Sequence, residues 1–268
     1  MSIGVLLLPN VPWPELARRA AEVEAAGFDA VWVDDHIVHP ARPESPWLEA
    51  WTTLAGLATE TRAITIGPLV SNIVLRAPAL LARQALTVDE LSGGRLDVGI
   101  GAGYAPSDHA ALGEEPWPDA ERFRRFEAAV AQVRETAPGL PLTVAAHGRR
   151  ALGVAARYGD AWVSYGGFGL TPDAAFAATR GRVERLNELA GGRPIRRRLL
   201  AGSAALTQEP IWQSVDAFDE YVGRYRAIGI DEFAFHWPPL ATNPNVTPAV
   251  VDEIVARQAR SKASSSRS

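Results

Sequence analysis

The sequence predicts a single-domain α/β fold, a (β/α)8 TIM barrel in which each of eight parallel strands is followed by a helix. Short apolar runs alternate with longer amphipathic segments along the chain, eight times each. The length of 268 residues suits one such barrel, and no Pro/Ser-rich linker marks a domain boundary. An open doubly wound sheet is the alternative that the same alternation allows.

The first half of the chain contains four predicted strands and their helices. The strands are Ile3–Leu8, Asp29–Val33, Ile64–Val70 and Leu96–Ile100, and the helices are Pro14–Ala26, Trp47–Glu60, Ala79–Leu91 and Asp119–Glu135. The turn Ser92-Gly93-Gly94 places a glycine at the C-cap of the third helix. We expect a long polar loop between the fourth strand and the fourth helix.

The second half of the chain repeats the alternation of strands and helices. Its strands are Leu142–Ala145, Ala161–Ser164, Arg198–Leu206 and Glu232–His236, and its helices are Arg149–Tyr158, Pro172–Ala190, Ser214–Ile228 and Thr247–Arg260. Residues 1–260 therefore form the predicted barrel. Residues 261–268 are rich in Ser, Lys and Arg and are predicted to be a disordered tail.

Composition and charge narrow the classes of function. The net charge of −4 provides no broad basic surface for nucleic acid. The absence of cysteine excludes disulfides, iron–sulfur clusters, thiolate zinc sites and cysteine nucleophiles. No apolar run reaches the roughly 20 residues of a membrane span, and the apolar start lacks the basic segment and cleavage site of a signal peptide. We therefore expect a cytoplasmic protein that does not bind membranes.

The histidines give the clearest chemical signal. All five follow the C-terminal end of a predicted strand, which is the face where barrel enzymes keep their active sites. They are His36, His39, His109, His147 and His236. The second strand ends in Asp34-Asp35-His36, and such a group is costly unless it is paired or used in chemistry. We expect the active site to be centred on Asp35 and His36; a local salt-bridge cluster is the alternative.

Glycine-rich stretches follow three other strands. Gly101 and Gly103 end the fourth strand without the immediate helix of a dinucleotide fingerprint, so they favour a flat ligand close to the backbone or tight barrel packing. His147-Gly148-Arg149-Arg150 opens a helix and is a candidate anion site, or a solvated helix start. Residues 165–169, "YGGFG", provide further N–H groups for a phosphate. Trp47 and Trp237 are the tryptophans expected to line a pocket for a planar ligand.

Several catalytic motifs are absent from the sequence, namely HExxH, the Walker A loop and GxSxG. A barrel metal hydrolase needs several His and Asp ligands, and the first predicted strand has no histidine. We therefore predict no metal site, although a metal hydrolase built from scattered ligands stays open as an alternative.

Four segments together resemble the luciferase-like monooxygenase superfamily. They are "GFDAVWVDDHI", "AITIGPLVSNIVLRAPALLARQALTVDELSGGRLDVGIGAGY", "RRALGVAARYGDAWV" and "AIGIDEFAFHWP". The resemblance covers most of residues 1–236 in order. It implies a (β/α)8 barrel, often a dimer, that binds flavin mononucleotide (FMN) or the deazaflavin coenzyme F420 for hydride transfer or oxygenation. The "VDDH" turn is most similar to the F420-dependent branch.

The resemblance also implies roles for individual residues. Asp35 and His36 would contact the cofactor ring, with His36 as proton donor or transition-state stabiliser. Leu69–Val70 would be a non-prolyl cis peptide bond behind the ring, and Asn72 would hydrogen-bond to it. The other cofactor-binding positions are Gly101, Gly103 and Tyr104 in the turn after the fourth strand, and His147, Gly148, Arg149, Gly166 and Gly167 near the phosphate.

The chain also departs from the superfamily pattern. Glu135 reaches Leu142 through only "TAPGLP", where many members carry a longer insertion, and the usual glycines before the fifth helix are reduced to "AAHGRR". A glutamate that some F420 dehydrogenases carry after the fourth strand is missing, and only Asp108 lies nearby in the sequence. A sugar-phosphate substrate is therefore not expected.

The resulting hypothesis is a homodimeric oxidoreductase that transfers a hydride between F420 and a small organic substrate, in which the cofactor performs the redox chemistry. The first alternative is an FMN-dependent monooxygenase, which would consume oxygen and need a flavin reductase as partner. The second alternative is a cofactor-free, non-catalytic barrel.

Overall fold

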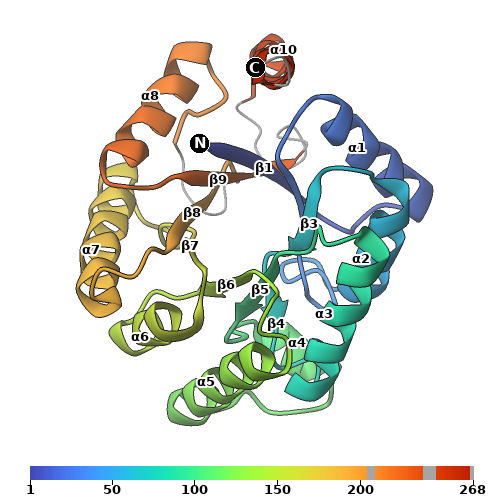
Figure 1. Ribbon diagram of the computed structural model, residues 1–268, viewed down its shortest axis with the longest axis vertical. Helices are drawn as coiled ribbons and strands as arrows, with labels where there is room; N and C mark the ends of the chain where they lie inside the picture. Colours follow the sequence, from blue (N-terminus) through green and yellow to red (C-terminus); the bar gives the residue numbers. More distant parts are fainter. Residues whose placement is uncertain (204–208, 238–245, 266–268) are drawn as a thin grey trace.

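The computed structural model describes residues 1–203, 209–237 and 246–265, and it confirms the predicted barrel (Figure 1). Parallel strands at the centre are surrounded by helices. The sheet order is β3-β2-β1-β9-β8-β7-β6-β5-β4. The strands are β1 (Ser2–Leu7), β2 (Ala30–Val33), β3 (Thr65–Pro68), β4 (Ser71–Asn72), β5 (Val98–Gly101), β6 (Leu142–Ala145), β7 (Ala161–Ser164), β8 (Arg196–Ala201) and β9 (Glu232–Trp237).

β3 and β4 are two parts of one barrel strand. The sequence predicts a single strand over Ile64–Val70, but β3 pairs with β2 whereas β4 pairs with β5. The Leu69–Val70 peptide bond between the two parts is cis, as the family resemblance implies. A parallel bridge joins Ile66 to Leu96, just before β5, and brings the two edges of the sheet together. The sheet is therefore closed, which excludes the open doubly wound alternative.

The helices cover the outside of the sheet. They are α1 (Trp13–Ala25), α2 (Ala50–Glu60), α3 (Pro78–Ser92), α4 (Pro106–Ala111), α5 (Asp119–Thr136), α6 (Arg149–Tyr158), α7 (Pro172–Ala190), α8 (Val215–Ala227) and α10 (Pro248–Ser265). Pro78 lies in the first turn of α3, where its missing N–H costs no hydrogen bond, and Gly93 is the predicted C-cap with φ +69°. Within the described residues, we find no helix that has both the length and the apolar character of a membrane span.

A small hydrophobic core fills the inside of the barrel around Trp32, which is 2 % exposed. Glycines on the neighbouring strands make room for this indole, since a Cβ on Gly4 or Gly67 would lie 2.8 or 2.9 Å from it. Towards the N-terminal ends of the strands, the guanidinium of Arg198 lies 4.0 Å from the indole centroid and pairs with Asp97 and Glu232. Paired charged side chains therefore fill the interior of the barrel at this end.

Most predicted boundaries lie within three residues of the observed ones, and the larger differences from the structure are as follows. The loop expected after the fourth strand contains a helix, α4. The strand predicted over Arg198–Leu206 begins and ends earlier, at Arg196 and Ala201, because its pairing with β9 stops at Ala201; residues 204–206 lie outside the described residues. α10 continues through Ser265, past its predicted end, and residues 266–268 of the predicted tail lie outside the described residues.

Candidate active site

A cavity of about 540 Å³ opens at the C-terminal ends of the strands, the face predicted to hold the active site. Its floor is the apolar top of the barrel interior and includes Leu6, Leu69, Val163 and Leu200. The segments that follow β2, β5, β6 and β7 form its walls. The wall residues that carry ionisable or aromatic groups are Asp34, Asp35, His36, His39, Arg42, Trp47, Tyr104, His147, Tyr165, Phe168 and His236.

The two aspartates that follow β2 have different partners. Asp35 is 1 % exposed and accepts hydrogen bonds from the guanidinium of Arg76 and from the backbone N–H of Asn72. Its charge is therefore neutralised, and it joins the end of β2 to β4. The carboxylate beside His36 in the cavity is instead Asp34, whose Oδ1 lies 3.6 Å from His36 Nε2. Burial raises the pKa of Asp34 above its ordinary value.

His36 lies between two carboxylates, those of Asp34 and Asp108. Its Nδ1 is 2.7 Å from Oδ2 of Asp108, whereas its Nε2 faces Asp34. Burial alone lowers the pKa of an imidazole, but the charges of the two carboxylates outweigh it and raise the pKa of His36 to about 9. The ring is therefore protonated at neutral pH and can donate a proton or a hydrogen bond to a ligand.

Asp108 is a site residue that the sequence analysis did not assign. It lies in α4 with 0 % exposure, and it accepts hydrogen bonds from Asn72 Nδ2 (2.7 Å) and from the backbone N–H of Ile37 (3.0 Å). The sequence does contain signals for this helix, because Pro106 followed by an acidic residue is typical of a first helical turn. No feature of the sequence around Asp108 predicts its contact with His36.

The predicted residues of β3, β4 and the turn after β5 all line the cavity. They are Leu69, Val70, Asn72, Gly101, Gly103 and Tyr104. A Cβ on Gly101 would lie 2.4 Å from Cγ2 of Val70, and one on Gly103, whose φ is +67°, would lie 2.4 Å from Oδ1 of Asn72. Both glycines are therefore required by close packing of the chain itself. Tyr104 is 57 % exposed at the mouth of the cavity.

The predicted phosphate segments are only partly brought to the cavity. His147 lines it, with Nε2 3.1 Å from the hydroxyl of Ser164, and burial lowers the pKa of His147 to about 3, so that the ring is neutral. The other four residues lie outside the lining, Gly148 and Arg149 exposed at the start of α6, and Gly166 and Gly167 buried after β7. Their assignment to a phosphate site stays a prediction.

Two ring systems of the cavity wall have buried nitrogens without a hydrogen-bond partner in the described part of the chain. These are Nε1 of Trp47 and both ring nitrogens of His236. Burial lowers the pKa of His236 to about 4, so this ring is neutral. Because each unpaired buried polar group costs about 1–3 kcal/mol, a ligand with polar groups at its edge would relieve this cost. His109, in contrast, packs against Trp117 with 5.2 Å between ring centroids, outside the cavity lining.

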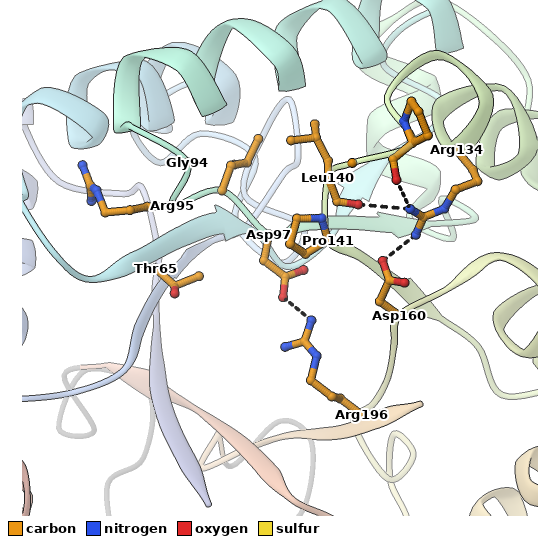
Figure 2. Close-up of a pocket in the computed structure, with 12 residues that line it drawn as sticks. Thr65, Gly94, Arg95, Asp97, Arg134, Leu140, Pro141, Asp160 and Arg196 are labelled. Atoms are coloured by element: carbon orange, nitrogen blue, oxygen red, sulfur yellow. Dashed lines mark hydrogen bonds and ion pairs between the residues drawn. The ribbon is translucent and has the colours of Figure 1, made fainter. Parts of the chain in front are cut away.

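A second cavity, of about 530 Å³, opens at the opposite end of the barrel (Figure 2). Its charged side chains already have partners within the chain. Arg134 is paired to Asp160 at 2.5 Å and Arg196 to Asp97 at 3.1 Å, and Arg95 donates to backbone carbonyls. The described residues also contain no group of three His, Cys, Asp or Glu side chains arranged to hold a metal ion. Because barrel enzymes work at the C-terminal face, we assign the active site to the first cavity.

Comparison with known proteins identifies the family of the chain. The model of the luciferase-like monooxygenase family matches residues 1–229. The chain is 36 % identical over 126 residues to the F420-dependent glucose-6-phosphate dehydrogenase of Amycolatopsis mediterranei, and 36 % identical over 103 residues to the 5,10-methylenetetrahydromethanopterin reductase of Archaeoglobus fulgidus. These matches cover 45 % and 38 % of this chain, but only 37 % and 29 % of those two proteins.

Solved structures share the fold. An F420-dependent secondary alcohol dehydrogenase in complex with an F420-acetone adduct superposes with a TM-score of 0.72 at 20 % identity, covering 93 % of this chain and 98 % of that one. The EDTA monooxygenase of Chelativorans sp. BNC1 superposes with a TM-score of 0.71 at 14 % identity, covering 98 % and 93 %. At these identities the likeness establishes the barrel architecture alone.

Proposed function

The chain belongs to the luciferase-like monooxygenase family, and we propose that it is an oxidoreductase that transfers a hydride between coenzyme F420 and a small organic substrate. The observation that carries the proposal is the position of His36. Its ring carries a proton at neutral pH and lies in the wall of a cavity whose floor is apolar. A hydride transfer to a carbonyl needs such a proton donor beside it.

The cavity fits a flat tricyclic cofactor. The side chains of Leu69 and Val70 offer an apolar surface, and the unpaired nitrogens of Trp47 and His236 offer hydrogen-bonding groups at the wall. When bound, F420 would supply the hydride from its ring. The protein would exclude water with its apolar floor and hold a proton at Nε2 of His36, the ring nitrogen that faces the cavity residue Asp34.

The charges around the cavity favour an uncharged substrate. Arg76 is committed to Asp35 and Glu49, and His147 and His236 are neutral. Of the arginines, the described residues place only Arg42 in the lining, and it is exposed and contacts His39 at 3.4 Å. A phosphate substrate usually meets a cluster of cations. We therefore propose a small ketone or secondary alcohol rather than a sugar phosphate.

Separate titrations with F420 and FMN test the proposal. We expect F420 to bind, and we expect the protein with reduced F420 to reduce a small ketone such as acetone. His36→Gln should retain F420 binding within about threefold and lose turnover by about 10²-fold, the usual contribution of a proton donor. Tight binding of FMN without binding of F420 would instead support the oxygen-consuming monooxygenase with a reductase partner. Binding of neither cofactor would support the non-catalytic barrel.

We also propose that the protein is a cytoplasmic homodimer, on the basis of the family resemblance. The chain has a mass of 28.8 kDa, so light scattering should report twice this mass in solution. A mass equal to that of one chain would contradict the dimer.

A further inference from the structure

The short helix α4 places one buried carboxylate against three different groups near the cavity. Asp108 lies 2.7 Å from His36 Nδ1 and 2.7 Å from Asn72 Nδ2 through Oδ2, and 3.0 Å from the backbone N–H of Ile37 through Oδ1. The Asn72 amide and the Ile37 backbone can act only as donors towards it. Both carboxylate oxygens are therefore already acceptors before the imidazole is considered.

This arrangement determines which imidazole nitrogen carries a proton. A carboxylate whose two oxygens both accept hydrogen bonds from neutral donors is stabilised as an anion, and an anion needs a donor at Nδ1. Nδ1 of His36 therefore keeps its proton whether the ring is charged or neutral. Nε2 is then the nitrogen that gains or loses a proton, in the same way that an outer partner fixes the tautomer of other functional histidines.

The other groups around the ring do not compete for this role. Asp34 faces Nε2 at 3.6 Å, beyond hydrogen-bond distance. Trp47 and Tyr104 flank the ring with centroids 6.4 and 6.2 Å away. Asp35 acts on His36 through its charge alone and is already bound to Arg76. Burial and the charges of Arg42 and His36 lower the pKa of His39.

We propose that Asp108 is the positioning residue of this site, which holds the proton of His36 on Nδ1 and leaves Nε2 to exchange a proton with the ligand. Its catalytic consequence rests on the proposed function, whereas the tautomer itself is a property of the protein without cofactor. Asp108 would thereby fix the tautomer of His36 from α4, a helix distant from His36 in the sequence.

Nitrogen-15 NMR of histidine-labelled protein without cofactor tests the tautomer directly. The chain has five histidines, so single substitutions can assign each signal. In the wild type at a pH above the His36 titration, we expect the neutral ring to carry its proton on Nδ1. A proton on Nε2 would overturn the proposal without the need for any variant.

Two matched variants separate charge from position. Asp108→Asn and Asp34→Asn each remove one carboxylate beside the ring, and each should lower the His36 titration midpoint by about 1–3 pH units. Asp108→Asn can still accept from Nδ1 through its amide oxygen, so Asp108→Leu, which removes the acceptor, is the variant that should change the tautomer of the neutral ring. The proposal fails if Asp108→Leu keeps the wild-type tautomer while the folded signals of the other four histidines are unchanged.

A kinetic experiment tests the catalytic consequence. With reduced F420 and acetone, Asp108→Leu should lower turnover by about 10²-fold, shift the pH dependence of the rate, and change the F420 dissociation constant by less than about threefold. Unchanged turnover would refute the positioning role. If F420 does not bind the wild type, the proposed function fails, but the NMR result still decides which nitrogen of His36 keeps its proton beside Asp108.

Discussion

The protonation of His36 should make the stability of the protein depend on pH between neutrality and mild alkali. The pKa of His36 is about 9 in the folded protein and 6.5 when unperturbed. A gap of about 2.5 at 1.36 kcal/mol per pKa unit corresponds to about 3 kcal/mol. Because the folded protein binds this proton more tightly, the contribution is fully present below about pH 6.5 and is lost as the pH rises through about 9.

Urea unfolding of wild type and His36→Gln, followed by tryptophan fluorescence from about pH 6 to about pH 10, measures this contribution. The difference in unfolding free energy between the two proteins should shrink by about 3 kcal/mol across the range. Taking the difference removes the titration of groups that both proteins share.

His147→Gln is the matched control, because His147 lines the same cavity but burial lowers its pKa to about 3. Its ring is neutral in the folded protein across the whole range, so its difference from wild type should change only near pH 6.5 and below, where the unfolded histidine takes up a proton, and should be flat from about pH 7.5 to about pH 10. The reasoning is refuted if the His36→Gln difference does not fall between about pH 7.5 and about pH 9, or if it has levelled off well below pH 9.

Three further predictions concern the barrel interior, the cavity turn and a buried acid. Arg198→Met leaves Asp97 and Glu232 with only the partly exposed Arg196 as a cation and should lower the unfolding free energy in urea by about 3 kcal/mol. A loss below about 1 kcal/mol would contradict this. Gly103→Ala should weaken F420 binding and lower thermal stability, because φ at this position is +67° and Asn72 Oδ1 would lie 2.4 Å from the new Cβ. Gly113→Ala is the control for backbone strain alone, because Gly113 has a similar φ of +72° but no atom near the new Cβ. Burial raises the pKa of Glu209 to about 7, so in thermal-melting measurements the stability of the wild type relative to Glu209→Gln should fall as the pH rises from about 4.5 through about 7.

Periodic patterns in the sequence predicted most of the fold. β6, α6, β7 and α7 begin and end at the predicted residues, because apolar periodicity and turn residues are properties of neighbouring positions. The face of the active site also followed from order along the chain, since parallel strands in a barrel bring their C-terminal ends to one side. The identity of His36 as a candidate came from the same reasoning.

The assignment of partners within the site needed the closed barrel. The sequence placed two aspartates before His36 but could not show that Asp35 is taken by Arg76 while Asp34 remains beside the imidazole. The division of the third strand into β3 and β4 likewise depends on pairing with two different neighbours.

Local sequence thus determined the eight strand–helix units, and it predicted which end of the barrel would hold the site and that His36 would lie at its centre. Tertiary structure alone decided that Asp108, 72 residues further along the chain, is the hydrogen-bond partner of that imidazole. The physical reason is one of range. Apolar periodicity acts within a few residues, whereas a contact between distant side chains exists only when closure of the barrel brings two strand ends together.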